Sequence, residues 1–150
     1  MSHTALGPGT IEWAGTLYRT ILAPSDTGGV LSIVESITQP GYGPPRHVHR
    51  VEDETFVLLS GDCEFWLRGE RHRRGLGETF FVPRGAEHTF RVTGSKPGRH
   101  LTILTPGGFE GFFVEIATRD LRIPQDMPAI AEAATRFHLA FTGPPLEIAE

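Results

Sequence analysis

Residues 41–61, GYGPPRHVHRVEDETFVLLSG, contain two histidines separated by one residue and a glutamate five positions after the second histidine. Side chains on a β-strand alternate between its two faces, so His47 and His49 point to the same side of an extended segment. Glu54 follows a four-residue turn at residues 50–53, and a returning hairpin strand therefore brings its carboxylate beside the two imidazoles. This segment predicts a metal site built on a β-hairpin.

A second segment, residues 77–88 (GETFFVPRGAEH), supplies a fourth candidate ligand, His88. Pro83 is expected to end a strand without removing a ladder hydrogen bond, and Gly85 permits the sharp turn that precedes the histidine. His88 must then reach the other three side chains from a distant strand. Three imidazoles and one carboxylate suit a first-row transition metal. We expect one divalent ion at this site (Fe, Mn, Ni, Co, Cu or Zn), because these donors accept all six metals.

Short apolar segments separated by turns rich in Gly and Pro run through most of the chain, which indicates an all-β sandwich or barrel. A closed barrel is the expected form, because closure removes exposed sheet edges. The predicted strands are Leu17–Ala23, Val30–Thr38, Arg46–His49, Glu54–Leu59, Cys63–Leu67, Thr79–Val82, His88–Thr93, His100–Leu104 and Gly111–Ala117.

The last third of the chain changes to a helical pattern. Asp126 is a suitable N-cap with Pro128 in the first turn, and the helix is expected to cover Ala129–Phe141. Its apolar residues recur at helical spacing and form one face. We expect this helix to pack on the outside of the barrel or on a second subunit.

The composition predicts one soluble domain over residues 1–150, with a barrel core at about 16–118 and a helical segment at about 126–141. A net charge of −4 gives no field for nucleic acid, and no apolar run is long enough to span a membrane. The basic run Arg71–Arg74 is expected at a solvated hairpin tip. A single cysteine and the lack of a secretory leader pattern favour the cytoplasm.

Together, the two segments resemble the cupin superfamily. Its first motif, Gly-x5-His-x-His-x4-Glu-x6-Gly, is matched at every specified position from Gly41 to Gly61. Its second motif, Gly-x5-Pro-x-Gly-x2-His-x3-Asn, is matched from Gly77 to His88, but Val92 stands in place of the asparagine. The wider layout is similar to single-domain cupins of the quercetin-dioxygenase-like group. The resemblance implies a jelly-roll barrel, often a homodimer.

The resemblance also implies chemistry. The metal would be held by His47, His49, Glu54 and His88, and Glu54 would in addition take a proton from the substrate. The reaction would be dioxygenation of a small hydroxylated or enolisable substrate, aromatic and quercetin-like. Two alternatives stay open: a redox-neutral isomerase or lyase with the same metal, and a non-catalytic cupin that binds a small molecule.

Strand alternation indicates which residues share the chamber of the metal. Phe56 and Leu58 lie on the face of Glu54, while Phe90 and Val92 lie on the face of His88. His100 precedes a strand whose inner face is not fixed by the pattern, and it is a further pocket candidate. Arg46 and Arg84 are expected near the mouth of the chamber, and Glu52 and Asp53 are expected in solvent. The larger aromatic residues are expected to be core or subunit contacts: Trp13, Trp66, Phe109, Phe112 and Phe113. A chamber without Lys or Arg favours an uncharged substrate.

Overall fold

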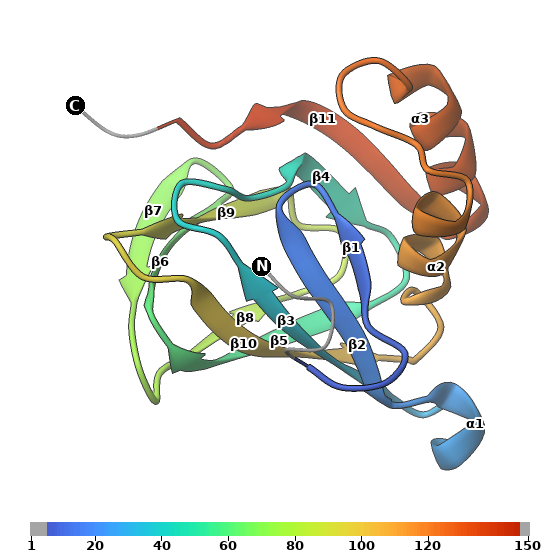
Figure 1. Cartoon of the computed structure of the whole chain (residues 1–150), viewed down its shortest axis with the longest axis horizontal. Coiled ribbons are helices and arrows are strands. Elements are labelled where there is room, and N and C mark those ends of the chain that lie inside the picture. The colour runs from blue at the N-terminus through green and yellow to red at the C-terminus, as the bar shows by residue number, and fades with distance from the viewer. Residues whose placement is uncertain (1–5, 148–150) are drawn as a thin grey trace.

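The computed structural model describes residues 6–147, whose strands form two antiparallel sheets that face each other (Figure 1). The first sheet has the order β1 (Ile11–Trp13), β2 (Thr16–Leu22), β3 (Ser32–Thr38), β10 (Gly98–Thr105), β5 (Asp53–Ser60) and β8 (Thr79–Val82). The second has the order β11 (Leu139–Pro145), β4 (Pro45–His49), β9 (His88–Thr93), β6 (Asp62–Leu67) and β7 (Glu70–Arg74). The helices are α1 (Pro24–Thr27), α2 (Gly111–Thr118) and α3 (Met127–Arg136).

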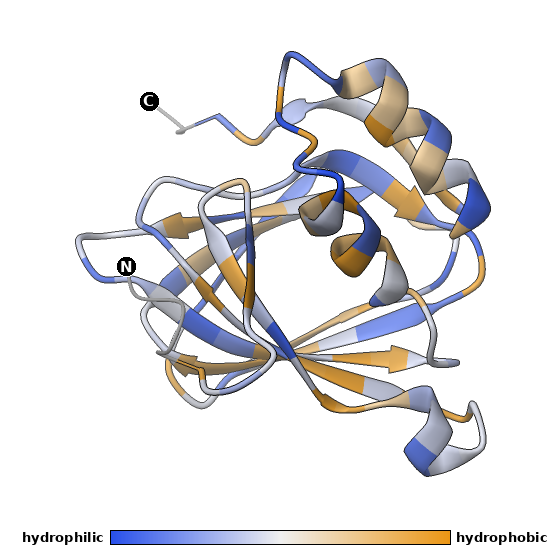
Figure 2. Cartoon of the chain, turned by 45° about the vertical axis from the view of Figure 1, so that its right-hand side comes forward, coloured by the Kyte–Doolittle hydropathy of each residue, from blue (hydrophilic) through white to orange (hydrophobic). Residues whose placement is uncertain are grey.

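The mostly-β fold and eight of the predicted strands are confirmed, with bounds shifted by at most two residues. Alternating burial explains why the pattern was readable: on β5 the side chains of Glu54, Phe56 and Leu58 are buried and those between them are half-buried. The same alternation shows as bands of hydropathy along the strands in Figure 2.

The expectation of a closed barrel is wrong, because hydrogen bonding within residues 6–147 gives two separate sheets. The edge strands of the first sheet are short, with three residues in β1 and four in β8, and such short edges offer little surface for unwanted pairing. The edge strands of the second sheet are longer, with seven residues in β11 and five in β7.

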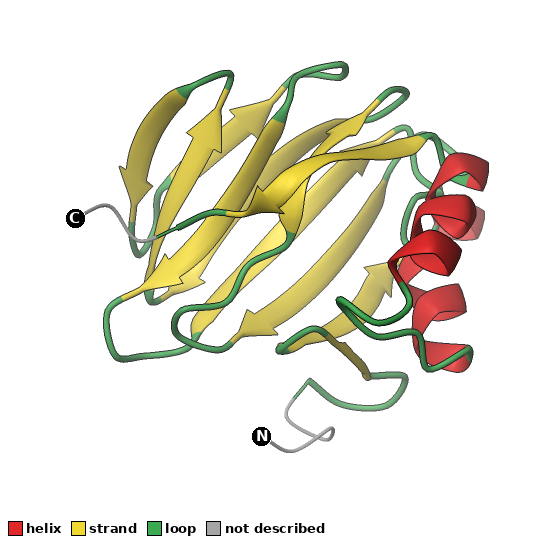
Figure 3. Cartoon of the chain, turned by 90° about the horizontal axis from the view of Figure 1, so that it is seen from above, coloured by secondary structure: helices red, strands yellow, loops and turns green. Residues whose placement is uncertain are grey.

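The segment predicted as a strand at Gly111–Ala117 is the helix α2. Phe112 and Ile116 are buried while Val114 is 50% exposed, which is the spacing of a helix face and not of a strand. An apolar run this short does not distinguish the two by itself. Figure 3 shows the helices together at one end of the sheets.

The predicted helix over Ala129–Phe141 is confirmed only in its first part, since α3 ends at Arg136. His138 has a left-handed φ of 60° and starts the turn into β11. Leu139 and Phe141 then pair with His49 and His47 on β4. The apolar face of α3 (Ile130, Ala133 and Ala134) is buried in a cluster that also contains Trp13 and Leu104.

The basic run Arg71–Arg74 is not a hairpin tip but lies within β7. The tip is Arg68-Gly69, where both residues have positive φ and Leu67 pairs with Glu70. This is the two-residue turn that suits the twist of a hairpin. Among the described residues, no helix is long and apolar enough to cross a membrane.

Two apolar clusters fill the interior. One cluster lies between the sheets around β5, β6, β8 and β9, and its buried members are Phe56, Leu58, Cys63, Phe65, Phe80, Val82, Ala86 and Val92. The other joins the sheets to the helices and includes Val34, Phe109, Phe112 and Leu139. The candidate metal ligands lie beside this second cluster, because His49 contacts the ring of Phe109.

Candidate metal centre

Strand β4 presents His47 and His49 on its inner face, where both are buried, as the alternation predicted. Their ring centroids are 5.1 Å apart. On β9, His88 stands directly opposite His47 across the ladder, with ring centroids 4.3 Å apart. Antiparallel pairing thus brings a histidine 41 positions further along the chain to the same place.

Glu54 reaches the three imidazoles from β5 in the opposite sheet. Its Oε1 contacts Nε2 of His49, and its Oε2 is 3.7 Å from Nε2 of His88. One potential ligand atom from each of the four residues lies within 4.8 Å of the others, and all four side chains are buried. A buried cluster of this composition can hold a metal ion.

Hydrogen bonds to the backbone fix which ring nitrogens are available. His47 donates Nδ1–H to the carbonyl of Pro45 at 2.7 Å, and His88 donates Nδ1–H to the carbonyl of Ala86 at 2.9 Å. Their Nε2 atoms are therefore the metal-capable ones. Nε2 of His88 is buried without a hydrogen-bond partner in the described part of the chain. This nitrogen lies close to the potential ligand atoms of the other three residues, and an unpartnered ring nitrogen in that position fits a divalent cation.

The electrostatics of the cluster suit a cation as well. Burial by itself would raise the pKa of Glu54, but His49 and His88 outweigh it and hold this pKa well below its usual range. Burial, with His88 and His49 adding to it, lowers the pKa of His47 well below its ordinary value. Burial by itself would lower the pKa of His88, but the nearby Glu54 carboxylate outweighs burial and raises this pKa. An ionised Glu54 and a neutral His47 are the forms that metal ligation requires.

The two acidic residues before Glu54 differ from each other. Glu52 was expected in solvent, but it is 4% exposed and its Oε1 has no hydrogen-bond partner among the described residues. The reason is tertiary: the turn after α3 covers this segment, where Arg50 N–H donates to the carbonyl of His138. Burial raises the pKa of Glu52. Asp53 points away from the cluster and accepts hydrogen bonds from Arg84.

A cavity adjoins the cluster, and His47, His49 and Glu54 form part of its wall. Of the five predicted pocket residues, Phe56, Phe90 and His100 line it. Leu58 and Val92 do not, because they are buried in the apolar cluster around β6 and β8. Strand alternation correctly predicted that Leu58 and Val92 point into the interior, but it did not predict which part of the interior they occupy.

Much of the cavity wall was missed by the sequence reasoning. Trp13, Phe109 and Phe112 are buried in the core, as expected, but together with Phe113 and Phe141 they also line the cavity. Tyr18 stacks on Phe113 with ring centroids 4.1 Å apart, and it lines the cavity too. The cluster of aromatic residues at positions 109–113 was the sequence signal that could have indicated this wall. The sequence pattern did not show which way these rings face.

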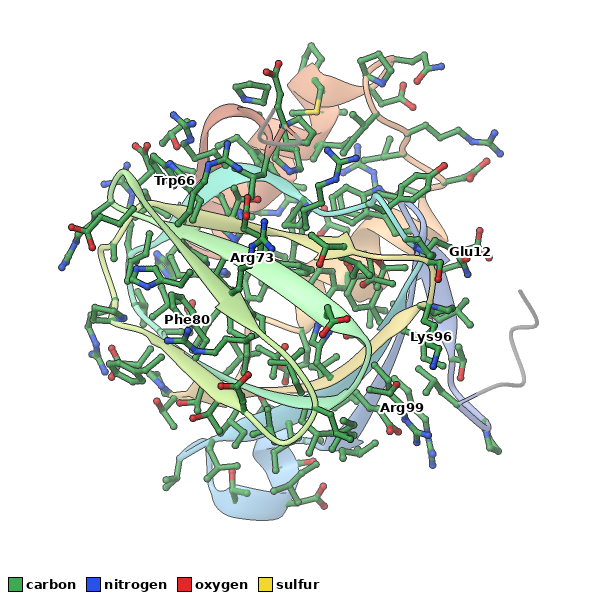
Figure 4. All side chains as sticks on the ribbon, turned by 90° about the vertical axis from the view of Figure 1, so that its left-hand side faces the viewer. Glu12, Trp66, Arg73, Phe80, Lys96 and Arg99 are labelled. Carbon is green, nitrogen blue, oxygen red and sulfur yellow. The ribbon has the colours of Figure 1, made fainter. Side chains whose placement is uncertain are left out.

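No lysine or arginine within residues 6–147 lines the cavity. Arg46 stacks on Trp66 with 4.0 Å between its guanidinium carbon and the ring centroid, and Arg84 pairs with Asp53. Figure 4 shows Trp66 on the side of the molecule formed by β6 and β7. The two arginines expected near the mouth are therefore engaged elsewhere.

Comparison with known proteins finds a family model that matches the segment carrying the cluster. Residues 34–104 match the model of the cupin domain, and this segment contains all four residues of the metal-capable cluster. The matched segment is 71 of the 150 residues, so the similarity to cupins covers just under half of the chain. The quercetin 2,3-dioxygenase of Bacillus subtilis (strain 168) is 31% identical over 87 residues, which cover 57% of this chain and 26% of that enzyme. The chain spans between 26% and 39% of the length of the curated relatives it matches.

Solved structures agree on the fold. The cupin domain of Schizosaccharomyces pombe Cnp3 superposes with a TM-score of 0.61 at 13% identity and covers 80% of both chains. The polyketide cyclase RemF of Streptomyces resistomycificus superposes with a TM-score of 0.55 at 25% identity, covering 65% of this chain and 68% of that one.

Proposed function

We propose that this chain is a metal-dependent dioxygenase whose substrate is a small, uncharged, hydroxylated or enolisable molecule of aromatic character. The observation that carries the proposal is the buried cluster of three histidines and one carboxylate at the wall of an aromatic cavity. The similarity to a quercetin 2,3-dioxygenase supports the reaction class.

His47, His49, Glu54 and His88 would hold one divalent transition metal ion. When bound, such an ion supplies Lewis acidity towards a substrate hydroxyl and, if it is redox-active, reactivity towards dioxygen. Both oxygen atoms of dioxygen enter the product in such a reaction, so no external reductant is required.

Glu54 is the proposed proton acceptor, acting through the carboxylate oxygen that is not engaged in ligation. Its depressed pKa keeps it ionised at neutral pH but makes it a weak base. It therefore removes a proton only from a hydroxyl whose acidity is already raised. The aromatic wall contributes by excluding water and by packing against a flat substrate.

Oxygen uptake by the metal-loaded protein tests the proposal. A panel of flavonols, β-diketones and enols is offered, and substrate loss is followed by absorbance. We expect uptake that matches substrate loss for one class, with both atoms of isotopically labelled dioxygen recovered in the product. Glu54→Gln should retain metal by elemental analysis and lose turnover, and full turnover in this variant would remove Glu54 as the base.

A redox-neutral reaction is the second candidate, favoured by the 25% identity to a polyketide cyclase. It would use Glu54 in the same way, on an enolisable substrate. Substrate loss without oxygen uptake would select this candidate. Tight binding of one compound with no turnover would instead indicate a non-catalytic binding protein.

A further inference from the structure

Two polar side chains lie together in the cavity away from the metal-capable cluster. Ser36 on β3 pairs with His100 on β10 across the ladder, and both side chains line the cavity. Tyr18 on β2 is the next residue in this row, opposite Ser36. The row runs across three neighbouring strands of the first sheet.

This row is distant from the ligands along the strands. His100 pairs with Leu58 and Leu104 pairs with Glu54, so the two rows are four positions apart on β5. At the rise of a strand this corresponds to about 13 Å between Cα atoms. Phe56 lies between the rows, and its ring and that of Phe90 are 5.7 Å and 5.3 Å from the His100 ring. The cavity thus has polar groups at two ends, and aromatic rings together with the side chain of Thr102 lie between them.

The side chains of this second polar end have unused hydrogen-bonding capacity. His100 is 3% exposed and Ser36 is 2% exposed, and no hydrogen bond joins either side chain to another described residue. Burial lowers the pKa of His100 to about 4, so at neutral pH its ring offers one N–H donor and one acceptor nitrogen. Buried polar groups normally have partners. Here the open side of both groups is the cavity.

The space available limits the size of the occupant. The centre of a water molecule can reach about 60 Å³ of the cavity. This is room for about four to six water molecules, or a compact molecule of about a dozen non-hydrogen atoms. A two-ring aromatic compound is of that size.

We infer that His100 and Ser36 bind an oxygen atom at the far end of the substrate, which selects a flat, uncharged, two-ring compound with oxygen functions at both ends. The inference rests on the proposed function for the end that faces the metal-capable cluster. The aromatic rings between the ends suit a flat molecule, and a cavity wall without lysine or arginine suits an uncharged one. His100 is thereby a specificity-determining residue.

The test compares two probes that differ only at the far end. Calorimetry under anaerobic conditions measures binding of 3-hydroxychromone and 3,7-dihydroxychromone to the metal-loaded full chain. The wild type should bind the dihydroxy compound about tenfold more tightly, as expected for a hydrogen-bonded pair in a buried site. His100→Phe should reduce this ratio to about one while leaving the affinity for 3-hydroxychromone within about twofold.

Matched variants separate recognition from folding. His100→Asn keeps a donor and an acceptor and should restore part of the preference, and Ser36→Ala should give an intermediate ratio. His72→Phe, on β7 away from the cavity, should keep the wild-type ratio. Elemental analysis should find equal metal content in all variants.

An unchanged ratio in His100→Phe, equal affinities in the wild type or binding of neither probe would overturn the inference. Oxygen uptake by the same samples is a separate readout. A ratio that collapses in His100→Phe without any oxygen uptake supports the second polar end and refutes dioxygenation. Oxygen uptake together with an unchanged ratio in His100→Phe supports dioxygenation and refutes the second polar end.

Discussion

The cavity has two walls of different origin. The inner faces of β1–β5, β9 and β10 form one wall, which carries three of the four candidate ligands as well as Ser36 and His100. The other wall comes from the segment around α2 and from β11, and it is mainly aromatic, with Phe109, Phe112 and Phe141. The strand wall supplies donors for a metal, and the helical wall supplies shape.

This division teaches that metal binding and substrate choice rest on different parts of the chain. The cupin match covers residues 34–104, which contain all four candidate ligands but none of the helical wall. We therefore expect substitutions in the two walls to have separable effects. The following experiments test that separation, beginning with the largest effect.

Removing a ligand from the strand wall should abolish metal binding. Outer-sphere substitutions at metal sites already cost about 10–100-fold in affinity, and His47→Ala removes a donor itself. We expect metal content after dialysis to fall to background. His72→Ala provides the matched control, since His72 is a histidine on β7 outside the cluster. Retention of stoichiometric metal by His47→Ala would refute the ligand assignment.

Truncating the helical wall should cost stability and spare the metal. Phe112 is 1% exposed, and its ring packs against Trp13 and Phe109 at centroid distances of 5.8 Å and 5.5 Å. Phe112→Ala should lower the free energy of unfolding by about 3–5 kcal/mol in urea titrations. The exposed neighbour Val114→Ala should change it by less than about 0.5 kcal/mol. Loss of metal in folded Phe112→Ala, to the extent seen in His47→Ala, would show that the walls are not separable.

Acid should destabilise the metal-free protein through the second polar end. Burial lowers the pKa of His100 from 6.5 to about 4, so between these values the unfolded chain binds a proton that the folded chain does not. The neutral, buried ring of His100 therefore lowers the stability of the folded chain only in acid. Its contribution to the free energy of unfolding is fully present above about pH 6.5 and is lost as the pH falls towards about 4. At about pH 4.5 the loss should be about 2–3 kcal/mol.

His100→Phe removes this titration but keeps that of His47 and Glu54. The difference in unfolding free energy between variant and wild type, measured in urea at about pH 7 and about pH 4.5, should therefore change in favour of the variant on acidification. An identical pH dependence in both proteins would mean that His100 is not buried in its neutral form.

The cluster and most strands were predictable because their signals are local. His47 and His49 share a strand face by alternation, and the two glycines that bound the first motif, Gly41 and Gly61, have positive φ values of 85° and 77°, which glycine adopts readily. Gly61 also cannot carry a side chain, since a Cβ there would lie 2.6 Å from the carbonyl oxygen of Pro97.

What sequence reasoning missed depends on contacts between distant segments. The face of Leu58 was correct, but which part of the interior it occupies is set by its neighbours on other strands. The burial of Glu52 follows from a turn near His138. The strand state of residues 139–141 follows from pairing with β4, which overrode a helical periodicity that continued past Arg136.

The pairing of β11 with β4 has a consequence for dynamics. β4 is bonded to β9 at a single residue pair, His47 with His88, so β11 provides most of the ladder that holds the two imidazoles of β4. Without β11, β4 would be an edge strand and prone to fraying. Slow amide hydrogen exchange at positions 47 and 49 would then depend on residues 139–145, and a chain shortened before Leu139 would keep every ligand yet present two of them on a backbone that opens far more often.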